Sequence, residues 1–306
     1  MTARPCIFGE VLFDHFPDGR RVLGGAPFNV AWHLQAFGVA PFLVSRVGAD
    51  DDGAAVQTAM SEWGLETAGL GVDASLPTGQ VRVQIEQNEP TYDIVHPVAW
   101  DEIHVPARLP EFALLYHGSL ALRSAESRSS CEELRKKAGG GTTLIFVDVN
   151  LRSPWWNRTD VIRSLEGANW VKLNAEELDL LAPGHGGPEQ RARALLDQFG
   201  LNGVLLTRGA QGAVLLNADG GRWTTRPQAG TEIRDTVGAG DAMASVMILG
   251  MLNGWDPQLS LDRAQALASG IVTRRGATVS EPAFYQHFIR AWSLDAMRTE
   301  HKQKAK

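Results

Sequence analysis

The 306-residue sequence predicts an α/β fold in which helices cover both faces of a mainly parallel sheet. Three observations support this prediction. Short apolar segments alternate with helical segments along most of the chain. Several of the apolar segments are apolar throughout, as are strands that helices cover on both faces. Two further segments have the pattern of β-hairpins, which predicts a small second sheet beside the core.

The expected core strands are short apolar runs. They are Arg4–Phe8, Phe42–Val47, Phe112–Tyr116, Thr143–Val149, Trp170–Leu173, Val204–Thr207 and Ala213–Asn217. The helices between them repeat their apolar residues with a period near 3.6, and each ends at a glycine. The clearest helices run from Asn29 to Gly38, from Gly53 to Gly64 and from Pro188 to Gly200.

The two hairpin segments are about 10–23 and 78–100. In the second, Val81, Val83 and Ile85 alternate with polar residues, as in a half-exposed antiparallel strand. A small exposed sheet inserted into an α/β core is suited to act as a lid. Although the length alone suggests about two domains, the pattern favours one domain over 1–306 with a lid inserted in it.

Composition narrows the class of protein. A net charge of −6 argues against a general nucleic-acid binder, because phosphate neutralisation needs a basic surface. Cys6 and Cys131 lack metal spacing and read as buried small hydrophobes in a reducing compartment. Glu10 and Asp14 interrupt the first apolar run, so we expect no signal peptide and a soluble, cytoplasmic protein.

The segment Asp235–Asp241 is rich in glycine and precedes a strongly apolar helical run. Glycines let successive backbone N–H groups point the same way, and a helix N-terminus adds partial positive charge. Together these features predict an anion site. The Asp241 carboxylate would then lie beside that site, either as a general base for an attacking hydroxyl or as a simple helix cap.

A second turn, Gly24–Asn29, also precedes a helix, and by itself it is more typical of a flexible turn than of a binding site. The sequence contains no phosphate-binding loop of the G-x-x-x-x-G-K-[ST] type.

Taken together, these two segments resemble the signatures of the ribokinase-like (PfkB) sugar kinases. The first matches at Gly24, Gly25, Ala26, Phe28, Asn29 and Ala31, and the second at Asp235, Thr236, Gly238, Ala239, Gly240 and Asp241. Further matches in order are Gly48 and Asp51, Pro77–Gly79, Asp148, Asn150 and Arg152, Asn174 and Glu177, Thr207, Gly209 and Gly212, and Gly276–Thr278. The resemblance covers nearly the whole chain and implies a ribokinase-like three-layer α/β/α core with a β-sheet lid.

Within that family the chain is most similar to bacterial fructokinases. Phe8–Glu10 with Asp14, Pro97–Asp101 and His117–Arg123 carry this likeness. Related keto-deoxy-acid kinases place an arginine in the lid to hold a carboxylate. The corresponding stretch here, Tyr92–Pro97, contains none, which favours a neutral sugar.

The resemblance implies a role for each matching residue. Asp241 would be the catalytic base, and the backbone of Gly238, Ala239 and Gly240 would hold the γ-phosphate. The acceptor ligands would be Asp14, Gly24, Gly25, Asn29 and Arg152. Trp100 would face the sugar from the lid or, equally, form a dimer contact through the lid sheets. Asp14 could instead be an exposed hairpin residue, and Asn29 a helix cap.

ATP would be bound by Thr207, Gly209, Gly212, Gly238, Gly240 and Ala277. The stretch from Thr207 to Gly212 also fits a plain hairpin turn. Asn174 and Glu177 would organise Mg²⁺, largely through water, although Asn-x-x-Glu after a strand is also a capping box. Asp235 and Ser280 are candidates for the K⁺ site of some relatives.

The resemblance therefore implies an ATP-dependent kinase that phosphorylates a ketohexose, with fructose as the expected acceptor. The alternatives are another acceptor (ribose, 2-keto-3-deoxygluconate or a nucleoside) and a non-catalytic sugar or nucleotide sensor on the same scaffold. Lid sheets could also join two copies into a homodimer. Nucleic acid and membranes are not expected as partners.

Overall fold

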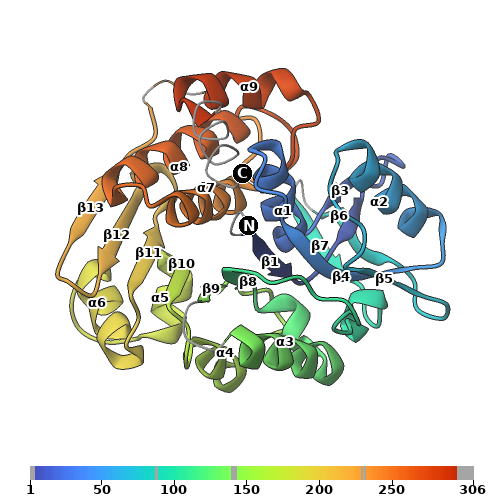
Figure 1. The fold of residues 1–306 in the computed structure, drawn as a ribbon, viewed down its shortest axis with the longest axis horizontal. Helices are drawn as coiled ribbons and strands as arrows, with labels where there is room; N and C mark the ends of the chain where they lie inside the picture. The colour runs from blue at the N-terminus through green and yellow to red at the C-terminus, as the bar shows by residue number, and fades with distance from the viewer. Residues whose placement is uncertain (1–3, 87–88, 139–142, 229, 231, 295–306) are drawn as a thin grey trace, which may run out of the picture.

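The computed structural model describes residues 4–86, 89–138, 143–228, 230 and 232–294, and it confirms the predicted α/β architecture (Figure 1). Within these residues, nine strands form one sheet in the order β13-β12-β11-β10-β9-β8-β1-β4-β5. The strands are β1 (Pro5–Phe8), β4 (Phe42–Gly48), β5 (Leu70–Asp73), β8 (Leu114–His117), β9 (Leu144–Asp148), β10 (Trp170–Asn174), β11 (Gly203–Thr207), β12 (Ala213–Asn217) and β13 (Arg222–Thr225). All neighbours pair in parallel except β11 with β12 and β12 with β13.

Helices cover both faces of this sheet, as Figure 1 shows. One face carries α1 (Ala26–Ala36), α2 (Asp51–Glu62), α7 (Ala239–Asn253), α8 (Pro257–Ile271) and α9 (Pro282–Ala291). The other carries α3 (Ala125–Ala138), α4 (Arg158–Leu165), α5 (Ala175–Leu181) and α6 (Pro188–Phe199). Successive strand residues point to opposite faces, so Ile7 packs with the first group of helices and Cys6 and Phe8 with the second.

A four-stranded sheet in the order β3-β2-β6-β7 lies beside this core. It consists of β2 (Leu12–His15), β3 (Arg21–Gly24), β6 (Gly79–Glu86) and β7 (Glu89–Ile94). The two segments expected to form hairpins thus meet in one sheet, with β2 parallel to β6. The predicted homodimer through this sheet stays a prediction.

Two core strands were absent from the predicted set, and both lie at sheet edges. In β5, Gly71 and Val72 are exposed, and β13 alternates exposed and half-buried residues. Edge strands need no continuous apolar run, because solvent reaches them. The core strands that were predicted agree with the structure to within two residues at each end.

One predicted boundary is wrong. The small sheet ends at Ile94, and the chain then enters the core as the 3₁₀ turn η1 (Ala99–Glu102). Trp100 lies in this turn with no exposed surface. The prediction that Trp100 faces a sugar from the lid is therefore wrong, because its indole packs into the apolar core beneath the small sheet.

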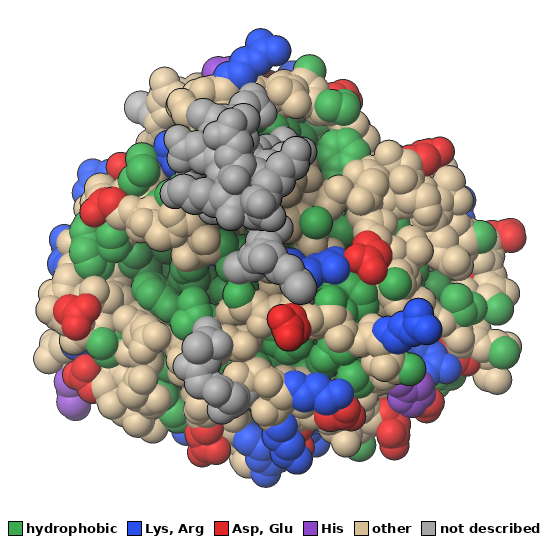
Figure 2. All heavy atoms as spheres, viewed as in Figure 1, with side chains coloured by type: hydrophobic (Ala, Val, Ile, Leu, Met, Phe, Trp, Pro, Cys, Tyr) green, Lys and Arg blue, Asp and Glu red, His purple; other side chains and the backbone are tan. Residues whose placement is uncertain are grey.

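On the face drawn in Figure 2, acidic and basic side chains are interspersed instead of separating by sign. In the part of the chain that the structure describes, no helix combines the length and the apolar character that crossing a bilayer requires. Cys6 and Cys131 are buried and unpaired.

Candidate active site

The glycine-rich segment Asp235–Asp241, here called the anion loop, leads directly into α7. Gly238 is the N-cap of this helix and has φ 80°, a left-handed conformation that favours glycine. A Cβ at Gly238 would overlap Ala277. The close approach brings a predicted nucleotide-binding residue, Ala277, against the predicted anion loop.

Asp235 holds these two loops together. Its Oδ1 accepts a hydrogen bond from the Val237 amide (3.0 Å) and its Oδ2 accepts one from the Gly276 amide (2.9 Å). Asp235 therefore shapes the anion loop, whatever further role it has toward a cation.

The two signature segments meet at Asp241 in the first turn of α7. Asn29, 212 positions earlier in α1, donates from Nδ2 to Asp241 Oδ2 at 2.8 Å. The other amide oxygen, Asn29 Oδ1, is buried without a hydrogen-bond partner among the described residues. A buried acceptor of this kind is costly unless a ligand satisfies it.

Asp14 and Gly24 lie beside Asn29. A Cβ at Gly24 would be 3.9 Å from both Asn29 Oδ1 and Asp14 Oδ2. Gly25 has φ 107°, and a Cβ there would approach the Glu10 carbonyl oxygen to 2.6 Å. The structure thus brings Asp14, Gly24, Asn29 and Asp241 together at one place, and we call these residues the acceptor cluster.

Burial makes the carboxyl groups of this cluster weaker acids. Desolvation raises the pKa of Asp241 to about 6, although the Asn29 hydrogen bond and the charge of Lys172 lower it. Desolvation also raises the pKa of Asp14 to about 6. A base of this strength suits proton abstraction near neutral pH.

Arg152 contributes a positive charge to the same cluster. It follows β9, is exposed, and lowers the pKa values of Glu10, Asp14 and Asp241. Its guanidinium makes no ion pair with any described carboxylate. It is therefore available to an anionic group of a ligand.

Glu10 was not predicted as a site residue. It follows β1, is 2% exposed, and its Oε2 has no hydrogen-bond partner among the described residues. Burial, with the nearby Asp241 carboxylate, raises the pKa of Glu10 to about 7. The sequence signal was the glutamate within an apolar run, which was used to exclude a signal peptide and as part of the fructokinase likeness, but was given no role in the site.

Lys172 was also missed. It lies in β10, and its Nζ donates to both Asp148 oxygens at 2.8 and 2.7 Å. A Cβ at Gly240 would be 3.1 Å from this Nζ, so the ammonium lies directly beneath the anion loop. Tyr116 completes the network by donating to Asp148 Oδ2 at 3.0 Å. A lysine within an otherwise apolar strand was the available signal.

Asn174 and Glu177 form the capping box that the sequence allowed. Asn174 Oδ1 accepts from the Glu177 amide, and Glu177 Oε2 accepts from the Asn174 amide, both at 2.8 Å. Glu177 Oε1 accepts a third bond, from the Leu151 amide at 2.9 Å. Burial raises the pKa of Glu177 against the opposing charge of Lys172. The capping prediction is confirmed, and the magnesium role stays a prediction.

Thr207 pairs with Asn174 in the parallel register of β10 and β11. The following loop turns back through η3 (Gly209–Gln211) into antiparallel β12. Gly209 and Gly212 both have positive φ, and a Cβ at Gly212 would overlap Thr225. The turn is thus a hairpin connection at the same edge of the sheet as Asn174, and its nucleotide role stays a prediction.

Comparison with known proteins agrees with this geometry. A family model described as pfkB family carbohydrate kinase matches residues 8–283. Aminoimidazole riboside kinase of Salmonella typhimurium is 30% identical over 297 residues, which cover 90% of this chain and 91% of that protein. Fructokinase-1 of Zea mays is 25% identical, with 90% and 93% covered.

A solved structure is also similar. The aminoimidazole riboside kinase from Salmonella enterica, complexed with aminoimidazole riboside and an ATP analog, superimposes with a TM-score of 0.80 at 27% identity. The match covers 94% of this chain and 99% of that one.

Proposed function

Because the chain belongs to the pfkB family of carbohydrate kinases, we propose that it transfers the γ-phosphate of ATP to a hydroxyl of fructose. The hydrogen bond between Asn29 and Asp241 carries this proposal. This bond joins Asn29, an expected ligand of the acceptor sugar, to the Asp241 carboxylate in the first turn of α7. The loop before this helix is suited to hold a phosphate.

In this proposal Asp241 accepts the proton of the attacking hydroxyl, and Asn29 orients the carboxylate. The N–H groups of Gly238, Ala239 and Gly240 receive the charge that develops on the transferred phosphoryl group. Phosphoryl transfer depends mainly on such positioning and charge stabilisation. The Lys172 ammonium lies next to Gly240 of this loop, and its charge favours the ionised form of Asp241 by lowering the pKa against the effect of burial.

The small sheet is suited to act as the lid of this site. Asp14 belongs to β2 and Gly24 to β3, so this sheet itself supplies two residues of the acceptor cluster. Closure over a bound sugar would exclude water and protect ATP from hydrolysis.

Asn174 and Glu177 fit a magnesium ion that is held through water. Each Glu177 oxygen accepts one backbone hydrogen bond and keeps a second lone pair, so a water molecule bound to the ion could donate to it without breaking the cap. Mg²⁺ would supply charge neutralisation for the ATP phosphates. Asp235, with Ser280, stays the candidate for a K⁺ site.

The charges around the acceptor cluster support a neutral acceptor. Glu10, Asp14 and Asp241 are acidic, and Arg152 is the cation that acts on all three. An acidic sugar such as 2-keto-3-deoxygluconate would be repelled by those carboxyls of the cluster that are ionised, chiefly Asp14 and Asp241 near pH 7. The fructokinase-like stretches favour fructose among neutral acceptors.

A second candidate acceptor is a riboside. The Salmonella relative, at 30% identity, is an aminoimidazole riboside kinase, and a riboside is also neutral. A panel of fructose, ribose, aminoimidazole riboside and 2-keto-3-deoxygluconate, read by ADP release, separates the candidates. We expect fructose to give the highest kcat/KM. Phosphorylation of the riboside but not of fructose would replace the first proposal with the second.

The catalytic role is tested with Asp241→Asn. We expect turnover to fall at least ~10²-fold while ATP binding is nearly unchanged, because only the proton acceptor is lost. ATP affinity is measured by calorimetry on the same preparation. Turnover close to wild type in this variant would contradict the mechanism, and sugar binding without ADP release in the wild type would indicate a sensor.

A further inference from the structure

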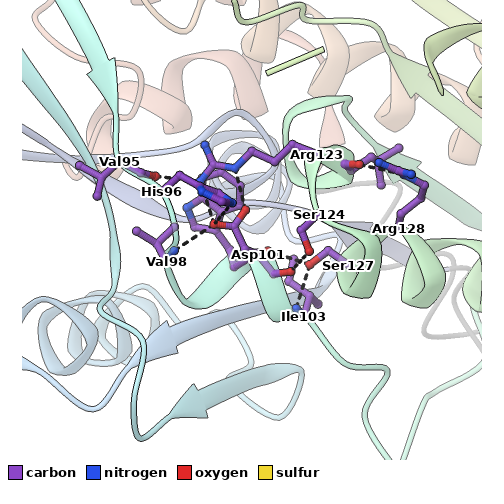
Figure 3. Close-up of polar contacts among 11 residues, drawn as sticks. Val95, His96, Val98, Asp101, Ile103, Arg123, Ser124, Ser127 and Arg128 are labelled. Atoms are coloured by element: carbon purple, nitrogen blue, oxygen red, sulfur yellow. Dashed lines mark hydrogen bonds and ion pairs between the residues drawn. The ribbon is translucent and has the colours of Figure 1, made fainter. Parts of the chain in front are cut away.

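The stretches Pro97–Asp101 and His117–Arg123 have no place in the proposed site, yet the structure joins their ends. Arg123 donates from Nε and Nη2 to the Asp101 carboxylate at 2.6 and 2.8 Å (Figure 3). The two side chains are only 3% and 4% exposed. A bidentate, buried arginine pair fixes the relative orientation of the two segments that it connects.

Two tryptophans enclose this arginine. The guanidinium lies 3.9 Å from the centre of the Trp100 ring and 4.4 Å from that of Trp155. The His96 ring packs on Trp155 with centroids 5.1 Å apart. Trp155 comes from the loop after β9, so Arg123 connects three separate segments of the chain.

One of these segments is the exit from the small sheet. Arg123 Nη2 also donates to the Val95 carbonyl at 2.8 Å, one residue after the end of β7. Figure 3 shows Val95 and His96 beside the guanidinium and Asp101. Asp101 Oδ2 accepts in turn from the Val98 amide at 2.9 Å, so the chain leaving the sheet is held at two points.

Another is the loop that carries Arg152. The Trp155 amide donates to the Arg152 carbonyl at 2.8 Å, which closes a tight turn. The start of the same loop is held by Glu177, which accepts from the Leu151 amide, and by Ser119, which donates to the Asn150 carbonyl at 3.3 Å. Arg152 thus lies between a fixed start and an end that Trp155 anchors.

We propose that Arg123 is a positioning residue that fastens the exit of the small sheet to the Arg152 loop, and so holds Arg152 toward the acceptor and the phosphate. This inference rests on the proposed function. The proposal gives Pro97–Asp101 and His117–Arg123 a shared structural role, since neither stretch places a side chain in the acceptor cluster.

Lysine cannot replace Arg123 in this task. Its ammonium keeps the charge, but it can neither bond Asp101 bidentately nor stack flat between two rings. Arg123→Lys therefore removes the fastening while a positive charge remains next to buried Asp101. The matched control is Arg263→Lys. Arg263 in α8 also lies over two tryptophan rings, Trp255 at 4.1 Å and Trp292 at 5.5 Å, beyond the opposite end of α7 from Asp241.

Hydrogen exchange in the ligand-free protein tests the fastening directly, without reference to activity. In Arg123→Lys we expect amides of 93–98 and 150–156 to exchange at least ~10-fold faster than in wild type, because their common anchor is lost. In Arg263→Lys these segments should exchange as in wild type. Unchanged exchange at 150–156 in Arg123→Lys overturns the proposal.

A double-mutant cycle tests whether the effect acts through Arg152. We expect Arg123→Lys alone to lower kcat/KM for fructose ~10-fold, and less than ~2-fold further in an Arg152→Met background. Arg263→Lys should leave kcat/KM unchanged in both. Fully additive losses would overturn the proposal. If the wild type phosphorylates no acceptor, the proposed function fails, and the exchange experiment still decides whether Arg123 fastens the two segments.

Discussion

Replacing Lys172 by methionine tests the buried charge pair beneath the anion loop. The Asp148 carboxyl has no exposed surface, and the Lys172 side chain is 9% exposed. Although burial disfavours the ammonium, the Asp148 carboxylate raises the pKa of Lys172 above its ordinary value. The methionine variant keeps much of the aliphatic volume and leaves Asp148 buried without its cation.

Breaking such a pair costs about 3–5 kcal/mol of unfolding free energy. A chain of 306 residues has an unfolding entropy of about 0.6 kcal/mol/K near 60 °C, so Tm should fall by roughly 5–8 °C. Thermal unfolding at pH 7 measures this shift. Adding Asp148→Asn to Lys172→Met should recover part of the loss, because the uncompensated carboxylate is then gone.

The matched control is Lys137→Met. Lys137 pairs with Glu133 at 2.9 Å on the surface of α3, where both side chains are about half exposed. An exposed i,i+4 pair contributes about 0.3–0.5 kcal/mol, so this Tm should change by about 1 °C. If Lys172→Met melts within 2 °C of wild type, the pair is not the stabilising element inferred here. Turnover in Lys172→Met should also fall at least ~10-fold, since the Asp148 carboxylate is then left without its cation beneath the anion loop.

Two further predictions concern the site, and a third concerns the N-cap of α2. Because burial raises the pKa of Asp241 to about 6, its base form is lost as pH falls, and kcat/KM should drop about tenfold per unit below pH 6; a flat profile down to pH 4.5 would contradict this. Gly238→Ala should abolish turnover, because a Cβ there overlaps Ala277 at a positive φ, whereas Gly19→Ala, whose Cβ would be in open space at the similar φ of 81°, should retain it; an active Gly238→Ala enzyme would refute the close approach. Asp50→Ala removes the α2 cap and two bonds from Thr78, so unfolding free energy should fall by about 2 kcal/mol in denaturant titrations at pH 7. Hydrogen bonds from Thr78 and Gly53 lower the pKa of Asp50 despite its burial, so this difference should shrink as pH falls through that pKa; a constant difference down to pH 2 would count against the assignment.

Local patterns were enough to predict most of the fold. Apolar runs identified the central strands, because these are covered on both faces, whereas β5 and β13 escaped notice because edge strands carry polar and exposed residues. The alternation of Val81 and Val83 correctly indicated the small sheet. That pattern ends at Ile94, and extending the sheet to Trp100 produced the wrong placement of that residue.

The site was only partly predictable, for a different reason. Asn29 and Asp241 belong to glycine-rich segments that are recognisable one by one, although nothing local shows that they hydrogen-bond. The roles of Lys172 and Glu10 in the site depend on their burial, and the fold creates that burial by bringing distant strands together. A charged residue within an apolar run is the sequence signal that indicates such a site. The residue that it pairs with can be identified only from the structure.

The charges of the site explain why the position of Arg152 should matter so much. The ionised carboxylates of Asp14 and Asp241 repel an incoming phosphate, and the charge of Lys172 is largely neutralised by Asp148. Of the groups that the structure describes, the backbone dipoles of the anion loop and the Arg152 guanidinium must then offset this repulsion. Any bound metal ion would add to their effect. A single exposed arginine can do so only if its loop is held in place, because a Coulomb interaction weakens with both distance and solvent screening. Arg123, buried between Trp100 and Trp155, would meet this requirement by holding the end of that loop through the Trp155 ring.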